Sequence, residues 1–337
     1  MSALSFSAPG KLYLLGEYAV LDGAPALLRS VDRRVTVTLC ESQTKAGWSL
    51  TAPELRLNQL ELGPDALLPA DLSDASAHEL RLFDEVRTAV DALAPAKDSY
   101  AITIESAAFL QNGHKLGLGS SAAVAVALTA ALATSRGCEL TRSEIFTVAA
   151  RAHSAAQGGK GSGGDIAASV YGGHILFRKG SEPLTVSWPE NLELFAVTTG
   201  TGSSTVDLVS RVAEYADQNP AAHDRDIHHL RSLAEQAETA LTNADDFLAL
   251  ANAYFLGVEV LDSHAQAGIV TDRHRELRDI AAASGAVFKT SGAGGGDVGL
   301  VFAKLDSAGH LQSVYSEAGA TVIPVPFSSH GVQAVTA

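Results

Sequence analysis

The sequence contains little cysteine, no long apolar run and no Asn-x-Ser/Thr acceptor for glycosylation. Its two cysteines, Cys40 and Cys138, lie far apart, and neither stands in a spacing typical of metal or redox pairs. No apolar run could span a bilayer, and residues 1–10 have neither a basic start nor a sustained apolar stretch. These absences argue against secreted and membrane-spanning proteins. We therefore expect a cytoplasmic protein with reduced cysteines.

Positive charge is also scarce. The chain has 24 lysines and arginines against 38 aspartates and glutamates, which gives a net charge of −14. This balance argues against nucleic acid and against an anionic membrane surface as partners. If the substrates are anionic small molecules, the few basic residues must gather at the site that binds them. The positions of individual lysines are therefore informative.

The chain has the length and the apolar content of a two-domain globular protein. It has 337 residues, of which 46% are hydrophobic and 18% charged. Strand-like and helical patterns occur in both halves, which predicts an α+β fold. A polar, proline-containing stretch at 183–191 predicts a boundary between a domain at 1–187 and a second domain at 188–337. A monomer and a homodimer are both compatible with the sequence.

Local patterns predict several elements around three glycine-rich segments. Alternating polar and apolar residues at 11–20 predict a strand, and the Ala/Val/Leu-rich stretch 121–134 predicts a buried helix. A second helix is expected at 141–157, where Thr141 is a candidate N-cap and Glu144 stands at the capping-box spacing. These helices flank the segments that carry the chemistry.

The first glycine-rich segment, Leu-Gly-Leu-Gly-Ser-Ser-Ala-Ala at 116–123, leads directly into the apolar helix. Glycines allow close backbone approach to a ligand, and a helix N-terminus offers unpaired N–H groups to phosphates. Ser120 or Ser121 could reach a Mg²⁺ ion held by those phosphates. A plain serine N-cap is the alternative. The loose dinucleotide fingerprint also fits at 117–122, but no strand runs directly into it, and the Walker pattern is absent.

The second and third segments are Gln-Gly-Gly-Lys-Gly-Ser-Gly-Gly-Asp at 157–165 and Lys-Thr-Ser-Gly-Ala-Gly-Gly-Gly-Asp at 289–297. Asp165 is either a helix N-cap or a carboxylate that accepts a substrate proton beside Lys160. The third segment lies between two predicted strands and is either a hairpin turn or a loop that approaches a ligand. Taken singly, neither segment decides between its two interpretations.

Together with Ala-Pro-Gly-Lys-Leu-Tyr-Leu-Leu-Gly-Glu-Tyr at 8–18, the segments resemble the GHMP kinase superfamily. Residues 9–18, 117–123 and 291–297 match its three motifs in order. The resemblance implies an N-terminal domain with a left-handed β-α-β unit, a ferredoxin-like C-terminal domain, and ATP with Mg²⁺ in the cleft between them. It assigns the ATP phosphates to Gly117, Leu118, Gly119, Ser120, Ser121 and Ala122, with Ser121 as the metal ligand.

Within the superfamily, details favour the bacterial and fungal phosphomevalonate kinases, with ATP and phosphomevalonate as substrates. The segment 157–165 and the His114-Lys115-Leu116 run are similar to that branch, whereas 151–155 lacks the Mg²⁺-binding glutamate of mevalonate kinases. The resemblance gives Lys11 and Asp165 catalytic roles, with Asp165 either a base or an orienting group. It assigns acceptor binding to Lys115, Lys160, Ser162, Ser203, Ser204, Ser291, Gly292, Ala293 and Gly294. Mevalonate kinase, another GHMP kinase, or a catalytically silent nucleotide-binding regulator are the alternatives.

Overall fold

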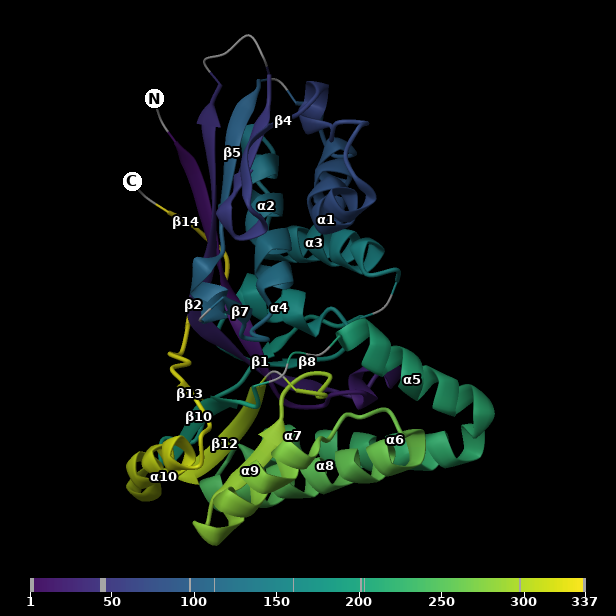
Figure 1. Cartoon of the computed structure of the whole chain (residues 1–337), viewed down its shortest axis with the longest axis vertical. Coiled ribbons are helices and arrows are strands. Elements are labelled where there is room, and N and C mark those ends of the chain that lie inside the picture. The colour runs from purple at the N-terminus through teal and green to yellow at the C-terminus, as the bar shows by residue number, and fades with distance from the viewer. Residues whose placement is uncertain are drawn as a thin grey trace.

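The structure is a computed structural model that describes residues 3–42, 47–96, 98–111, 113–159, 161–200, 202, 204–296 and 298–335. Its strands form two main sheets, the larger above the smaller in Figure 1. Short 3-10 turns at Ala19–Asp22, Pro53–Leu55, Pro64–Ala66 and Ala107–Phe109 join the elements. A large hydrophobic core runs through both sheets and their helices, and a smaller cluster around Tyr13, Leu28 and Phe177 lies apart from it.

In the described part of the chain, the larger sheet has eight strands in the order β14-β1-β2-β5-β3-β4, with β8 on β2 and β9 on β8. They are β1 (Leu4–Leu15), β2 (Ala26–Glu41), β3 (Ser49–Ala52), β4 (Leu57–Glu61), β5 (Tyr100–Glu105), β8 (His174–Phe177), β9 (Leu184–Thr185) and β14 (Gln333–Ala334). The pair β3–β5 is parallel, whereas β1–β2 and β2–β5 are antiparallel.

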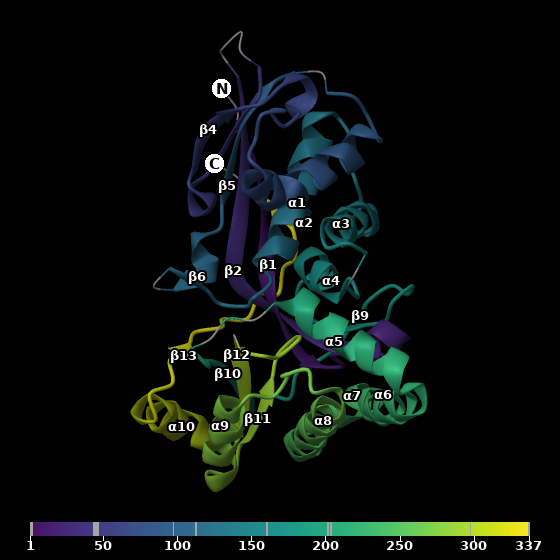
Figure 2. The ribbon, with the colours of Figure 1, turned by 45° about the vertical axis from the view of Figure 1, so that its right-hand side comes forward.

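Four helices cover one face of this sheet (Figure 2): α1 (Asp74–Asp91), α2 (Ser120–Ser135), α3 (Arg142–Ala156) and α4 (Gly164–Tyr171). Helices α2 and α4 pack on β1 and β2, while α1 and α3 pack on α2. Helix α2 is apolar around its whole circumference because it lies between the sheet and the other helices. The helix predicted at 121–134 is thus confirmed, as is the capping box of Thr141 and Glu144 that starts α3.

The smaller sheet is antiparallel, in the order β11-β12-β10-β13. Its strands are β10 (Leu192–Thr198), β11 (Val287–Thr290), β12 (Val298–Lys304) and β13 (Val322–Ile323). Helices α5 (Thr205–Gln218), α6 (Pro220–Ala234), α7 (Ala237–Ala240), α8 (Ala244–Ala265) and α9 (Asp272–Ala283) connect β10 to β11, and α10 (Leu305–Glu317) connects β12 to β13. This β-α-β-β-α-β succession is the ferredoxin-like arrangement. A two-stranded hairpin of β6 (Leu110–Gln111) and β7 (His114–Lys115) completes the elements.

The α+β prediction is confirmed, whereas the strand expected at 11–20 is wrong in its limits. Strand β1 ends at Leu15 because the backbone turns into the left-handed region at Gly16, with φ 97°, and at Tyr18, with φ 62°. A 3-10 turn then follows where the strand was expected. The left-handed β-α-β unit of the N-terminal domain and the domain boundary at 187/188 stay predictions.

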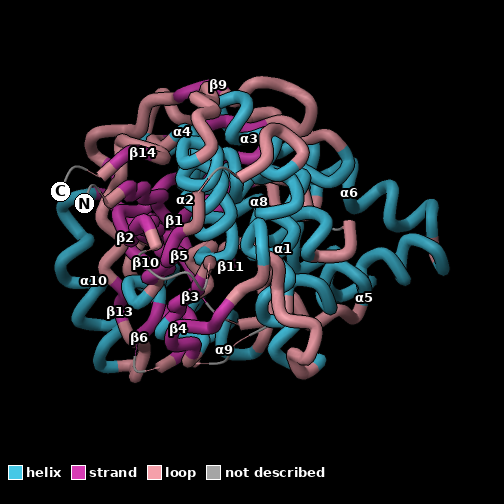
Figure 3. The backbone as a smooth tube through the Cα atoms, turned by 90° about the horizontal axis from the view of Figure 1, so that it is seen from above, coloured by secondary structure: helices cyan, strands magenta, loops and turns pink. Residues whose placement is uncertain are grey.

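The last described residues return to the larger sheet. Strand β14 pairs antiparallel with β1, which brings Ala334 opposite Phe6 (Figure 3). The guanidinium of Arg34 donates to the carbonyl of Gly331 at 2.6 Å and to Ser328 Oγ at 3.1 Å. The tail therefore connects the smaller sheet back to the larger one. Among the described residues, no helix combines the length and apolarity needed to cross a membrane.

Candidate active site

A cavity of about 750 Å³ lies where the two sheets meet. Residues of β1, of all three glycine-rich segments and of the chain between β10 and α5 line it. The segments 117–121, 161–165 and 291–294 are far apart in sequence and share this one space. The convergence supports the ligand-binding interpretation of the three segments over three unrelated turns.

The first wall of the cavity is the start of α2. Gly119 stands at the N-cap position with φ 80°, and no side chain caps the helix. The Nζ atom of Lys11 donates to the carbonyl of Gly117 at 3.4 Å, and a Cβ atom on Gly119 would lie 2.9 Å from Lys11 Cε. The positive φ therefore favours glycine here, and a Cβ atom would also have to displace the Lys11 side chain. The first-turn N–H groups and the lysine form a site for phosphates.

Most of the predicted ATP-binding residues line this wall. Gly117, Leu118, Gly119, Ser120 and Ser121 are lining residues, whereas Ala122 is fully buried and does not line the cavity. The Ser121 hydroxyl lies at the helix start. Mg²⁺ prefers oxygen ligands and usually keeps phosphate and water oxygens, which fits this position. No group of three or more His, Cys, Asp or Glu side chains suited to a metal occurs among the described residues.

The second wall carries Asp165 and Ser162. Gly163, with φ 85°, is the N-cap of α4, so Asp165 is not the helix cap that the sequence left open. Its Oδ1 atom accepts from the Ile166 N–H at 2.9 Å, and its other oxygen lies 3.8 Å from His153 Nδ1. Ser162 Oγ lies 2.7 Å from the Tyr13 hydroxyl. Burial and the charges of Asp165 and Glu17 raise the pKa of Tyr13, so this phenol stays protonated.

The sequence interpretation missed His153, having noted only that 151–155 lacks a carboxylate. This buried imidazole lies behind the cavity wall, with Nε2 3.0 Å from Ser121 Oγ and 3.2 Å from Gln157 Nε2. It therefore contacts both the proposed metal ligand and, through Nδ1, the proposed catalytic carboxylate. The signal available in the sequence was weak: a histidine and a glutamine four residues apart at the end of a helix.

The third wall, 291–294, is attached to the first motif. Ser291 Oγ accepts from the Tyr13 N–H and donates to the Tyr13 carbonyl, both at 3.1 Å, and the Tyr18 hydroxyl donates to the Ala293 carbonyl at 2.5 Å. Gly292 and Gly294 line the cavity with them. The Ser291 hydroxyl is thus engaged by backbone, while the loop around it faces the cavity.

The remaining predicted acceptor residues have mixed positions. Lys115 and His114 are exposed on the β6–β7 hairpin at the cavity rim. Ser204 also lines the cavity, and its side chain accepts from the Asp207 N–H at the start of α5. Lys160 and Ser203 lie outside the described residues. Among the described residues that line the cavity, the lysines are Lys11 on β1 and Lys115 on β7, in a chain of net charge −14.

A buried ion pair beneath the cavity was also missed. Lys289 on β11 donates to Glu17 Oε1, and both side chains are buried. The second oxygen of Glu17 has no hydrogen-bond partner among the described residues, and Glu17 lines the cavity. Burial lowers the pKa of Lys289, and the charge of Glu17 opposes that shift. The two residues are 272 positions apart in sequence.

Comparison with known proteins extends over the whole chain. Residues 84–173 match the family model described as the GHMP kinases N terminal domain. The sequence is 32% identical to the phosphomevalonate kinase of Streptomyces sp. (strain CL190), covering 95% of this chain and 96% of that protein. It is 28% identical to the mevalonate kinase of Thermococcus gammatolerans, covering 97% of each.

A solved structure shares the fold at lower sequence identity. It is the phosphomevalonate kinase of Streptococcus pneumoniae in complex with phosphomevalonate and AMPPNP, with a TM-score of 0.78 and 18% identity. The match covers 99% of this chain and 100% of that one. Both sheets of the present chain therefore have counterparts in that protein.

Proposed function

This chain belongs to the GHMP kinases, and from that premise we propose that it is the phosphomevalonate kinase of the mevalonate pathway of isoprenoid biosynthesis. Its substrates are then ATP and 5-phosphomevalonate. The observation that carries the proposal is the gathering of Lys11, His114 and Lys115 at one cavity in a chain of net charge −14. Asp165 and Glu17 also line this cavity, while Lys11 beside the helix start and the exposed Lys115 at the rim offer positive charge to the phosphates of both substrates.

In the proposed reaction, an oxygen of the acceptor's phosphate attacks the γ-phosphorus of ATP. A new P–O bond forms, the bond between the γ-phosphorus and the β–γ bridging oxygen breaks, and ADP leaves with that oxygen. In this proposal Lys11 and the first-turn N–H groups of α2, which border the cavity, stabilise the transferring phosphoryl group and the phosphates around it. The protein contributes position and charge here more than covalent chemistry.

A phosphate acceptor requires less proton removal by Asp165 than a hydroxyl acceptor would. A phosphate monoester has a second pKa of about 6, so most of it carries no proton at neutral pH. Asp165 then orients the acceptor and accepts the proton of the monoanionic fraction. Ser121 and the phosphate oxygens would hold Mg²⁺, which neutralises charge on the β- and γ-phosphates when bound.

The proposal is tested with ADP-coupled assays on purified protein, with phosphomevalonate and mevalonate as alternative acceptors. Phosphomevalonate should be the better acceptor by about 100-fold in kcat/KM, because mevalonate lacks the anion that compensates the cations. Equal turnover of the two acceptors would remove the acceptor assignment and leave the kinase assignment standing.

The variant Lys115→Ala tests the same point at the rim of the cavity. It should raise the KM for phosphomevalonate by about tenfold and leave the KM for ATP nearly unchanged, as expected for one lost charge-assisted contact. Lys179→Ala is the matched control, because Lys179 is an exposed lysine that does not line the cavity. A selective loss of ATP affinity in Lys115→Ala would assign Lys115 to the nucleotide instead.

A further inference from the structure

The third wall of the cavity rests on a turn between α8 and α9. The carbonyl of Ile269 accepts from the Gly295 N–H at 2.7 Å. A Cβ atom on Gly294 would lie 2.5 Å from the same carbonyl oxygen, so the two backbones are in direct contact. The position of the loop 291–296 therefore depends on where the turn 268–270 lies.

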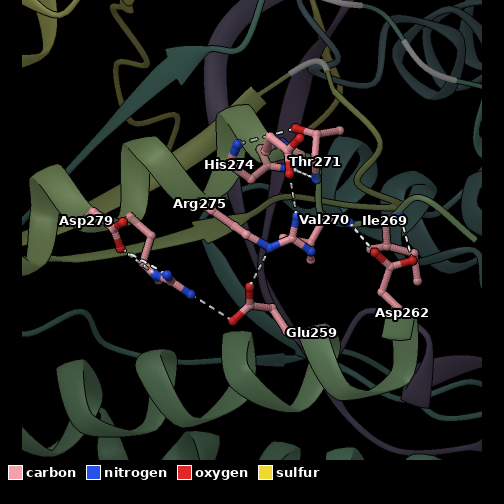
Figure 4. Close-up of polar contacts among 10 residues, drawn as sticks. Glu259, Asp262, Ile269, Val270, Thr271, His274, Arg275 and Asp279 are labelled. Carbon is pink, nitrogen blue, oxygen red and sulfur yellow. Dashed lines mark hydrogen bonds and ion pairs between the residues drawn. The ribbon is translucent and has the colours of Figure 1, made fainter. Parts of the chain in front are cut away.

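One carboxylate fixes that turn. Asp262, near the end of α8, accepts three backbone N–H bonds: from Gly268 at 2.7 Å and Ile269 at 2.8 Å on Oδ1, and from Val270 at 2.9 Å on Oδ2. Figure 4 shows the side chain pointing at the turn. Asp262 is buried, and no ion pair to it occurs among the described residues. Among the described residues, only backbone N–H groups hydrogen-bond to this carboxylate.

We propose that Asp262 is a positioning residue for the cavity wall 291–296. The Asp262 carboxylate bonds to the turn 268–270, and that turn contacts Gly294 and Gly295. The preceding Ala293 carbonyl accepts a hydrogen bond from the Tyr18 hydroxyl. No other side-chain group of the described residues is shown to bond those three N–H groups. Asp262 acts through this backbone contact and touches no substrate.

Asp262→Asn is the sharpest test, because it keeps the size and one oxygen of the side chain. The amide nitrogen would face the N–H of Gly268, Ile269 or Val270, and two donors cannot bond to each other. Glu259→Gln is the matched control. Glu259 lies one turn earlier on α8 and pairs with Arg275 at 3.3 Å and Arg278 at 2.9 Å (Figure 4). It does not line the cavity.

Two measurements are made on the full chain at a temperature where circular dichroism shows each variant folded. Backbone hydrogen exchange in Asp262→Asn should quicken at 268–270 and 291–296 and stay unchanged in α2 and β5. The kcat should fall by about tenfold or more, because sub-ångström misplacement at an active site is costly, while Glu259→Gln stays within about twofold. The KM for ATP should stay within about threefold, because the α2 helix start is not altered.

The expected fall in kcat without a comparable change in the KM for ATP rests on the proposed function, in which the third wall of the cavity binds the acceptor. The assay therefore uses whichever acceptor the wild-type chain phosphorylates, so that a wrong acceptor assignment is detected separately. Unchanged kinetics in folded Asp262→Asn would overturn the inference, as would faster exchange throughout the chain. If Asp262→Asn does not fold, Gly294→Ala strains the same contact from the other side, and normal kcat in that variant would equally overturn it.

Discussion

Breaking the buried pair of Glu17 and Lys289 should destabilise the protein far more than breaking an exposed pair. The substitution Lys289→Met keeps the length of the side chain and removes its charge. Lys289 is 0% exposed, and the Glu17 carboxylate that remains would lose its cation while staying 4% exposed. Removal of one partner from a buried pair costs about 3–5 kcal/mol, most of it from the charge left behind.

The matched control is Lys304→Met. Lys304 pairs with Asp245 at 2.7 Å, but the two side chains are 50% and 76% exposed, so water replaces the lost partner. An exposed pair contributes about 0–1 kcal/mol. The double variant of Glu17→Gln with Lys289→Met removes both charges and should recover about 1–3 kcal/mol relative to the sum of the single changes.

The free energy of unfolding is measured at pH 7 by urea titration, with circular dichroism as the signal. The dependence of this free energy on urea concentration is compared between the variants. The two lysine variants should then differ by about 2–5 kcal/mol. Equal losses in Lys289→Met and Lys304→Met would refute the reasoning, because the burial of the charge would then carry no cost. Additive effects in the double variant would show that the two residues do not interact.

Two further predictions concern catalysis and pH. Asp165→Asn should lower kcat by about 100-fold or more with little change in the KM for ATP, and a change of only a few-fold would remove Asp165 from the mechanism. Burial lowers the pKa of His174 to about 3 and that of His274 to about 4. Because the unfolded chain takes up these protons below its pKa of about 6.5, the free energy of unfolding should fall between pH 6.5 and pH 4, by about 2–3 kcal/mol per histidine. Urea titrations across this pH range test the prediction, and His174→Phe should reduce the change in the free energy of unfolding with pH. A free energy of unfolding that does not change between pH 6.5 and pH 4 would contradict the burial argument.

Local patterns in the sequence were sufficient to predict the helices around the cavity. The all-apolar stretch that became α2 and the Thr141–Glu144 box that starts α3 depend on neighbouring residues alone, and both are found as expected. The end of β1 was not predictable in this way. Tyr18 adopts φ 62°, a conformation that a tyrosine reaches only where surrounding contacts hold it, such as its hydroxyl bond to Ala293.

The candidate site could be predicted as three loops but not as a set of contacts. Glycine-rich motifs in a known order indicated that 117–121, 161–165 and 291–294 would share a ligand, and they line one cavity. The partners of Glu17 and of Asp262 gave no local signal, because a buried charge shows its compensation only in three dimensions. The roles given to Lys11 and Asp165 stay predictions.

The return of the chain to the larger sheet has a mechanical consequence. The backbone crosses between the two sheets once from β9 to β10 and again from β13 to β14, so two covalent connections join the halves. A body attached to another at two points can swing about the line through both points but resists twisting around any other axis. These two connections, together with the hydrophobic core and the buried pair of Glu17 and Lys289 that also join the halves, therefore resist twisting of the 291–294 wall away from the start of α2.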